Sequence, residues 1–448
     1  MLLRAYLPFT MLLSLVLLST NPLKAQVEPS ASGGPTADDD STMMTPPPVN
    51  GFPYPTTAGS ETRSNNLATS VTVNSAYIDN VLPDETVTPI GNFTGTITPG
   101  VTLDRSTPRQ MEQITYSPVF SFYEPTSTLN SIDQSANVAA QFHLSPHLAL
   151  SVRDFILKTS NVFNESYPFS SSITGSTPTS TPTVIAPFVE RFTNTTTGVV
   201  SYQFAANAMI GGGVLFESYN FPDQAQTQGF YDSRSIGGTV FYSRRLSRAQ
   251  YAGVAYEYER IRAYPLSIAG EARIHSLLPF YTVYFNRTFS LSISAGMQRV
   301  GETESTSFQS NSWAPSVVTS VGWQGRRGNI AASYSRSVTA GGGIVGTFNA
   351  NSVSGSGGWQ FSRTWSGSAS AFYRTFVSLG QTASRSVSSD YTAAQVSFYR
   401  TLGARMNVSF GYQHLNQNYS DIAVIAANPN SNREFVSITY QLTRPLGR

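Results

Sequence analysis

The chain has 448 residues, no cysteine and a formal net charge of +2, and only 12% of its residues are charged. A charged fraction about half that of an average soluble domain disfavours a soluble globular protein, and the lack of cysteine excludes disulfides. Lys24 and Lys158 are the only lysines, and the arginines are scattered, which argues against a nucleic-acid partner.

Residues 1–25 predict a secretory signal peptide. Arg4 precedes an apolar stretch at residues 11–18, and Ala25 ends a short segment that fits a cleavage site. The alternative, an uncleaved membrane anchor, is disfavoured because the apolar stretch is short. Residues 26–66 are rich in Pro, Ser, Thr, Gly and Asp without periodicity, which predicts a disordered tail.

From Leu67 onward, apolar and polar residues alternate in segments of about ten residues, the period and length of bilayer-crossing β-strands. No run of eighteen apolar residues follows the N-terminal stretch, so a closed β-barrel is the remaining way to span a bilayer. The segments come in pairs joined by short polar turns, most clearly at residues 105–110, 145–147, 247–250, 286–288, 324–329, 362–364 and 400–405.

Residues 67–448 therefore predict an all-β, antiparallel up-and-down transmembrane barrel of about 18 strands, with 16 as the alternative. Long connections separate the pairs at roughly 79–91, 124–134, 158–196, 218–235, 264–274, 301–314, 339–350, 378–390 and 415–432. Short turns on one side and long loops on the other are typical of outer-membrane barrels. This asymmetry places both termini, including the tail, on the periplasmic side.

Alternation alone does not say which face meets lipid, because a soluble β-sandwich would carry its apolar face inside. The signal peptide, the low charge and the strand length favour an apolar face in contact with outer-membrane lipid. The last strand is expected to close the barrel by pairing near Val71. Its lipid-facing row is Val436, Ile438, Tyr440 and Leu442.

The opposite face is mostly small and neutral, which predicts an aqueous lumen. Four charged residues are expected to face it, either tuning a weak selectivity or simply solvated: Arg153, Glu257, Glu259 and Arg374. Ten arginines fall at or near the short turns, where they either bind lipid phosphates or are solvated: Arg244, Arg245, Arg248, Arg287, Arg326, Arg327, Arg363, Arg400, Arg405 and Arg444.

The longest connection, 158–196, follows the fifth predicted strand, which resembles the placement of the constriction loop in general porins. An external loop is the equal alternative. No catalytic or phosphate-binding motif is recognisable, and the spacing of His143 and His147 would suit a metal on a helix rather than on a hairpin. We therefore expect no enzyme activity, no metal and no cofactor.

Several segments resemble a family of uncharacterised, porin-like outer-membrane β-barrel proteins from Acidobacteria-type bacteria. They are Tyr77-Ile-Asp-Asn80, Ser145-Pro-His147, Gly322-Trp-Gln-Gly325, Ala331-Ala-Ser-Tyr-Ser335 and Arg444-Pro-Leu-Gly-Arg448. The resemblance covers most of the chain from Leu67 and implies an outer-membrane location without implying an activity. The last strand also resembles the terminal signal recognised by the barrel-assembly machinery, although six residues follow Leu442.

Two functions fit these observations. A wide lumen lined by small neutral residues favours a passive channel for small hydrophilic solutes. Long Ser-, Thr- and Asn-rich loops suit the alternative, a structural or surface-display barrel without an open pore, in one version linked to exopolysaccharide export.

Overall fold

The computed structural model describes residues 64–81, 89–160, 189–222, 230–264, 270–286, 288–305, 308–341, 344–379, 388–419 and 430–446. The predicted signal peptide, nearly all of the predicted tail and the interior of the 158–196 connection lie outside these residues. No helix among the described residues is long and apolar enough to cross a bilayer.

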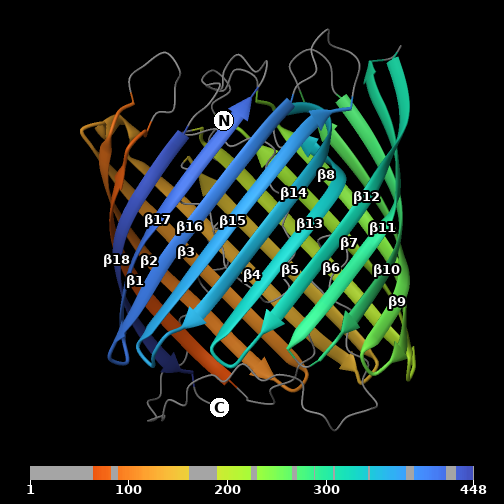
Figure 1. The fold of residues 1–448 in the computed structure, drawn as a ribbon, viewed down its shortest axis with the longest axis horizontal. Helices are drawn as coiled ribbons and strands as arrows, with labels where there is room; N and C mark the ends of the chain where they lie inside the picture. The colour runs from red at the N-terminus through yellow and green to blue at the C-terminus, as the bar shows by residue number, and fades with distance from the viewer. Residues whose placement is uncertain are drawn as a thin grey trace.

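The described chain forms one closed antiparallel sheet of 18 strands (Figure 1). The first nine are β1 (Ser64–Ile78), β2 (Asn92–Thr107), β3 (Gln110–Glu124), β4 (Ser131–Ser145), β5 (Leu148–Thr159), β6 (Arg191–Ala205), β7 (Ala208–Asn220), β8 (Ser233–Ser247) and β9 (Gln250–Ala263). The rest are β10 (Gly270–Tyr284), β11 (Phe289–Ser305), β12 (Phe308–Gln324), β13 (Gly328–Gly341), β14 (Ile344–Gln360), β15 (Trp365–Ser378), β16 (Ser388–Leu402), β17 (Met406–Tyr419) and β18 (Asn430–Pro445).

The closing pair joins the two ends of the sheet. In the β1–β18 register Val71 lies opposite Tyr440, which confirms the predicted closure near Val71. Between these strands the hydroxyl oxygens of Thr72 and Thr439 are hydrogen-bonded at 2.8 Å. The predicted 18-strand barrel is thus confirmed, and the 16-strand alternative is wrong.

The two ends of the barrel differ in their connections. At the short-turn end, the bottom of Figure 1, neighbouring strands are joined by two to four residues. Side chains stabilise these turns: the Asn286 carbonyl oxygen accepts hydrogen bonds from the backbone N–H groups of Thr288 and Phe289, both at 2.8 Å. Gly403, with a φ of +75°, supplies the left-handed turn before β17. We call the opposite end, at the top of Figure 1, the long-connection end.

Two of the predicted long loops are wrong. Residues 301–314 and 339–350 belong largely to strands, because β11 runs to Ser305 before β12 begins at Phe308, and β13 runs to Gly341 before β14 begins at Ile344. Figure 1 shows β11 and β12 rising beyond the rim at the upper right. The strands have 12 to 17 residues, because paired hairpins such as β11–β12 continue beyond the rim of the barrel.

The β12–β13 pairing ends at Val317 and Arg336, and above it the two strands separate. The Val338 backbone N–H on β13 then donates a 2.8 Å hydrogen bond to the Gln298 side chain on β11, bypassing β12. Val338 also packs into a buried apolar cluster with Ile261, Ala272, Ile274, Val300 and Ala314. The β13–β14 hairpin therefore leans over the inner face of β9–β11.

Candidate functional site

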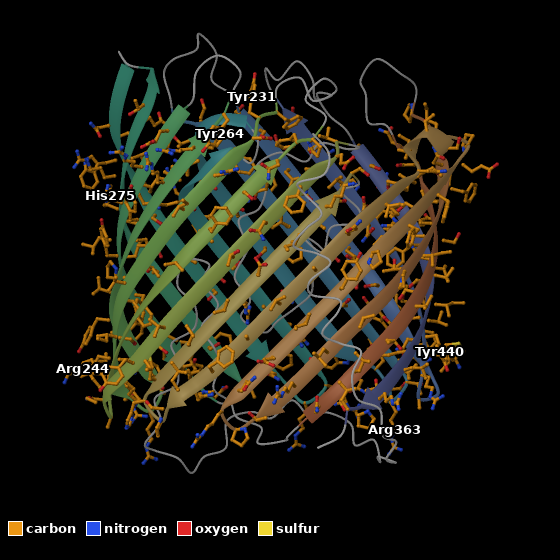
Figure 2. All side chains as sticks on the ribbon, turned by 180° about the vertical axis from the view of Figure 1, so that it is seen from behind. Tyr231, Arg244, Tyr264, His275, Arg363 and Tyr440 are labelled. Carbon is orange, nitrogen blue, oxygen red and sulfur yellow. The ribbon has the colours of Figure 1, made fainter. Side chains whose placement is uncertain are left out.

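The barrel wall has an outer face and an inner face, and strand alternation assigns neighbouring residues to opposite faces. The row Val436, Ile438, Tyr440 and Leu442 is exposed on the outer face of β18. Figure 2 shows Tyr440 on the wall towards the short-turn end and His275 on the outer wall towards the other end. The outer face is thus apolar over most of its height.

Charged residues bound this apolar band. On the outer face of β8, Arg234 and Arg244 are ten residues apart and enclose Ile236, Gly238, Val240 and Tyr242. On β18, Glu434 and Arg444 are also ten residues apart. At a rise of ~3.3 Å per residue and a strand tilt of ~40°, ten residues span about 25 Å along the barrel axis. That height matches the apolar band of a transmembrane barrel.

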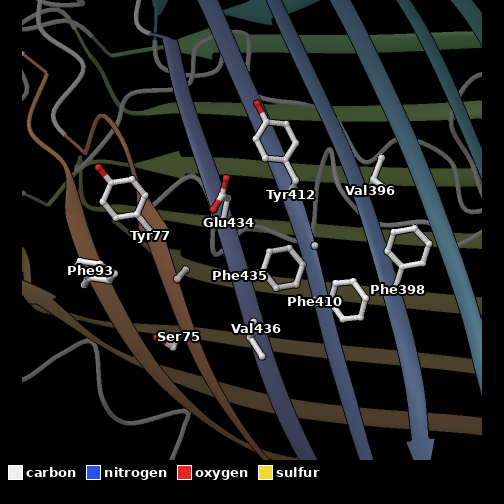
Figure 3. A pocket seen from close by; sticks show the side chains of 12 residues that line it. Ser75, Tyr77, Phe93, Val396, Phe398, Phe410, Tyr412, Glu434, Phe435 and Val436 are labelled. Atoms are coloured by element: carbon white, nitrogen blue, oxygen red, sulfur yellow. The ribbon is translucent and has the colours of Figure 1, made fainter.

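An apolar groove crosses the closing seam on this outer face. Figure 3 shows Tyr77, Phe93, Phe410 and Tyr412 around it, with Glu434 between the two tyrosines. Glu434 lies opposite Tyr77 on one side and Tyr412 on the other in the strand register. Because the groove is open to the outside of the wall, it is part of the outer face and not of a solute path.

The inner face carries hydroxyl groups that pair between neighbouring strands. Hydrogen bonds join Thr282 to Ser292 at 3.0 Å and Ser368 to Ser397 at 3.0 Å. Further pairs are Ser333 with Ser354 at 2.6 Å and Ser409 with Ser437 at 2.5 Å. Small hydroxyl side chains line the wall without filling the lumen, which suits an aqueous interior.

The inner face also holds aromatic rings, which the sequence analysis did not predict. Phe241 lies over Gly211 and Phe280 lies over Gly253, each directly across the strand pair. A Cβ atom on Gly411 would lie 2.8 Å from the ring of Phe435. Both Phe241 and Phe280 are buried, so each glycine provides the flat surface on which a ring packs.

The four predicted lumen charges all lie on inner-face rows. On β5, Arg153 lies on the same face as Leu157 and Thr159, which are buried. Glu257 and Glu259 share their face of β9 with residues of the inner clusters. The Arg374 guanidinium lies 4.7 Å from the centroid of the Phe376 ring on β15.

The structure brings two of these charges to a third that sequence reasoning missed. Glu217 on β7 accepts a 2.6 Å hydrogen bond from the Tyr219 hydroxyl, and the charges of Glu259 and Arg374 both act on its carboxyl group. Figure 1 draws β15 in the front wall, with β7 in the wall behind it. Glu217, Glu259 and Arg374 thus form an inner charge group, and only three-dimensional closure reveals it.

Nine of the ten predicted turn arginines are described, and all nine lie at the short-turn end; Arg287 lies outside the described residues. Figure 2 shows Arg244 and Arg363 at this end. The Arg400 guanidinium lies 5.3 Å from the centroid of the Trp365 ring, a cation–π contact. Like Arg244, it is an exposed, outer-face arginine.

A second group of arginines, on the outer face towards the long-connection end, was missed. Glu271 on β10 binds Arg260 at 2.6 Å, Arg262 at 3.0 Å and Arg273 at 2.8 Å. The sequence does carry a signal for it, since Tyr258, Arg260 and Arg262 alternate on one face of β9. Within the described ranges, no three His, Asp or Glu side chains are grouped so that they could hold a metal ion.

No family model and no curated protein matches the chain. Among solved structures, it is similar to OpdO of Pseudomonas aeruginosa, with 11% identity and a TM-score of 0.43 over 85% of this chain and 97% of that one. It is also similar to the FrpB iron transporter from Neisseria meningitidis (F3-3 variant), with 9% identity and a TM-score of 0.42 over 84% and 81%. The outer membrane protein opdK from Pseudomonas aeruginosa gives 10% identity and a TM-score of 0.39 over 84% and 99%. Similarity at this level identifies neither a family nor a function for this chain.

Proposed function

We propose that the chain is an outer-membrane channel for passive diffusion of small hydrophilic solutes. The observation that carries the proposal is a closed 18-strand wall with hydroxyl groups and charges inside and an apolar outer band of about 25 Å. A barrel of this strand number is too wide to be filled by its own side chains. A wide, hydrated lumen with few charges passes solutes by size and polarity, without a specific binding site.

In this proposal the apolar band contacts membrane lipid, the short-turn end faces the periplasm, and the long-connection end faces outward. Arginines at the short-turn end, such as Arg244 and Arg400, lie just beyond the band, where guanidinium groups can bind lipid phosphates. Reversing the charge of several of them should slow assembly into vesicles or lower heat stability. Unchanged assembly and unchanged stability would rule out this role.

One observation favours the alternative, a structural barrel without an open pore. The β13–β14 hairpin leans over the inner face of β9–β11, held by the hydrogen bond between Val338 and Gln298 and by the apolar cluster around Val300. A hairpin in this place narrows the mouth at the long-connection end. A conductance measurement shows whether solutes pass this narrowed mouth.

Conductance of the refolded barrel in a planar bilayer tests the two functions. A channel gives steady ohmic steps, whereas a barrel closed by the hairpin gives none. Gln298→Ala removes the side chain that holds Val338, so in a channel it should increase the unit conductance. Gln395→Ala is the matched control, because Gln395 is also an inner-face glutamine but bonds Gln413 instead. Silence of the native protein and of Gln298→Ala would overturn the channel.

A further inference from the structure

Three adjacent strands, β9 to β11, carry an outer-face arginine at the same height. Arg260 lies ten residues from the start of β9, Arg273 eleven residues from the end of β10, and Arg299 ten residues from the start of β11. All three distances are counted from the short-turn end. On β8, Arg234 lies further from that end, by thirteen residues, and is opposite Arg262 in the strand register. Arg260, Arg273 and Arg299 therefore lie at one level, where the apolar band ends, and Arg234 and Arg262 lie just beyond it.

Below these arginines, towards the short-turn end, the outer face carries exposed apolar and aromatic residues. Tyr256 lies four residues before Arg260 on β9 and Leu277 four residues after Arg273 on β10, with Tyr258 and His275 in between, and Met297 lies two residues before Arg299 on β11. Tyr256 and His275, one on each of two neighbouring strands, are hydrogen-bonded at 2.8 Å. A molecule complementary to this surface has an apolar part that contacts the apolar band and an anionic group that lies beside the arginines.

Glu271 gathers three of the arginines without neutralising the group. One of its carboxylate oxygens accepts hydrogen bonds from Arg260 and Arg262, and the other accepts one from Arg273. A guanidinium has five N–H donors, so each arginine keeps N–H groups beyond the one that binds Glu271, although the Nε–H of Arg260 is buried. With Arg234 and Arg299, five positive charges and one negative charge lie together, a net charge of +4.

We propose that this surface, the outer wall of β8–β11 at the level of Arg260 and Arg273, binds the phosphate group of a membrane lipid in the leaflet at the long-connection end. Planar guanidinium groups bind phosphate oxygens in pairs, and several arginines held at fixed spacing by Glu271 lose little side-chain entropy on binding. The lipid's acyl chains then lie along Tyr256, Leu277 and Met297. The inference rests on the proposed membrane location of the outer wall.

Trp313 provides a local probe. It lies on the outer face of β12 directly opposite Arg299 and is 67% exposed, whereas Trp323, Trp359 and Trp365 lie at the short-turn end. A variant with Trp323, Trp359 and Trp365 replaced by Phe retains Trp313 as its sole tryptophan. It is refolded into phosphatidylcholine vesicles that contain a minor fraction of phosphatidic acid. Bromine on the acyl chains of either lipid, at equal mole fraction, quenches tryptophan on contact.

Brominated phosphatidic acid should associate with the Trp313 site about fivefold more strongly than brominated phosphatidylcholine, a ratio worth roughly 1 kcal/mol. Arg260→Gln/Arg262→Gln/Arg273→Gln should bring the ratio to about one, because Glu271 then lies unpaired and repels phosphate. The matched control keeps Trp365 as the sole tryptophan, and its ratio should not change with the three substitutions.

The outcomes separate the inference from the proposed function. Equal quenching of Trp313 by the two lipids in the native background overturns the lipid site alone. A preference that persists after the three Gln substitutions overturns its assignment to these arginines. Absence of quenching by both lipids means that the outer wall is not in contact with acyl chains, which overturns the proposed function as well.

Discussion

The outer and inner faces of the same strands differ in what determines their residues. On β9, Tyr256, Tyr258, Arg260 and Arg262 alternate on the outer face, and their type changes with height along the barrel. On the inner face of the same strand, Gly253 matches the ring of Phe280 on the next strand. In the proposed membrane location, the residue types of the outer face therefore follow the depth in the bilayer, whereas those of the inner face follow the neighbouring strand.

This difference has a physical origin. Lipid is a uniform solvent at each depth, so an outer residue is selected by polarity and tolerates many shapes. Inner residues contact individual partners, as in the hydroxyl pair of Thr282 and Ser292, so their shape and hydrogen-bonding capacity matter. Substitutions that separate polarity from shape should therefore have different effects on the two faces.

The largest effect is expected from a charge on the outer face. Val353 is exposed on the outer face of β14, and Val353→Arg should destabilise the refolded barrel by about 2–4 kcal/mol because the guanidinium enters the lipid region. The matched substitution Ser356→Arg places the same side chain on the inner face of β14. Equilibrium unfolding in urea should give a near-native free energy for Ser356→Arg. Equal losses for the two variants would contradict the assignment of faces.

A smaller effect is expected from a methyl group on the inner face. Gly253→Ala places a Cβ atom against the backbone oxygen of Tyr242 and the ring of Phe280, and should cost about 1–3 kcal/mol through overpacking. Gly95→Ala is the control, because a Cβ atom there meets nothing within 4 Å. The temperature at which the folded band disappears in gel electrophoresis measures both variants. A stable Gly253→Ala would show that the Phe280 ring and the backbone at Tyr242 both adjust without cost.

The parts of this structure that were predictable depend on local signals. A period of two and the short turns predict the strand count and the closure of the last strand on the strand near Val71, which the structure places opposite Tyr440. The extent of β11–β14 was not predictable, because pairing beyond the bilayer has no length limit. Glu217 and Arg374 come together only when the barrel closes and brings β7 and β15 to face each other. The common level of Arg260, Arg273 and Arg299 is set by the register between strands. Neither feature can be recognised from the sequence of a single strand.

Hydroxyl pairs on the inner face should contribute less than aromatic packing. Thr72→Val leaves the Thr439 hydroxyl at the closing seam without its 2.8 Å partner and should cost about 1 kcal/mol in urea unfolding. The double variant Thr72→Val/Thr439→Val leaves no unsatisfied hydroxyl and should recover most of that loss. If the double variant loses the sum of both single losses, the pair does not act as a unit.

The smallest effect, on permeation rather than stability, should distinguish acidic residues of the two faces. Glu257 and Glu259 lie on the inner face, so Glu257→Gln/Glu259→Gln should lower the cation-to-anion permeability ratio by about twofold, or roughly 0.4 kcal/mol. Glu434→Gln removes a carboxylate from the outer face, beside Tyr77 and Tyr412, and should leave the ratio unchanged because in the proposed channel the ions pass inside the wall. The reversal potential in a salt gradient measures each ratio. An equal shift for Glu434→Gln would mean that the charge acts through the wall or that ions pass along the outer seam, and the distinction between the two faces would then not extend to permeation.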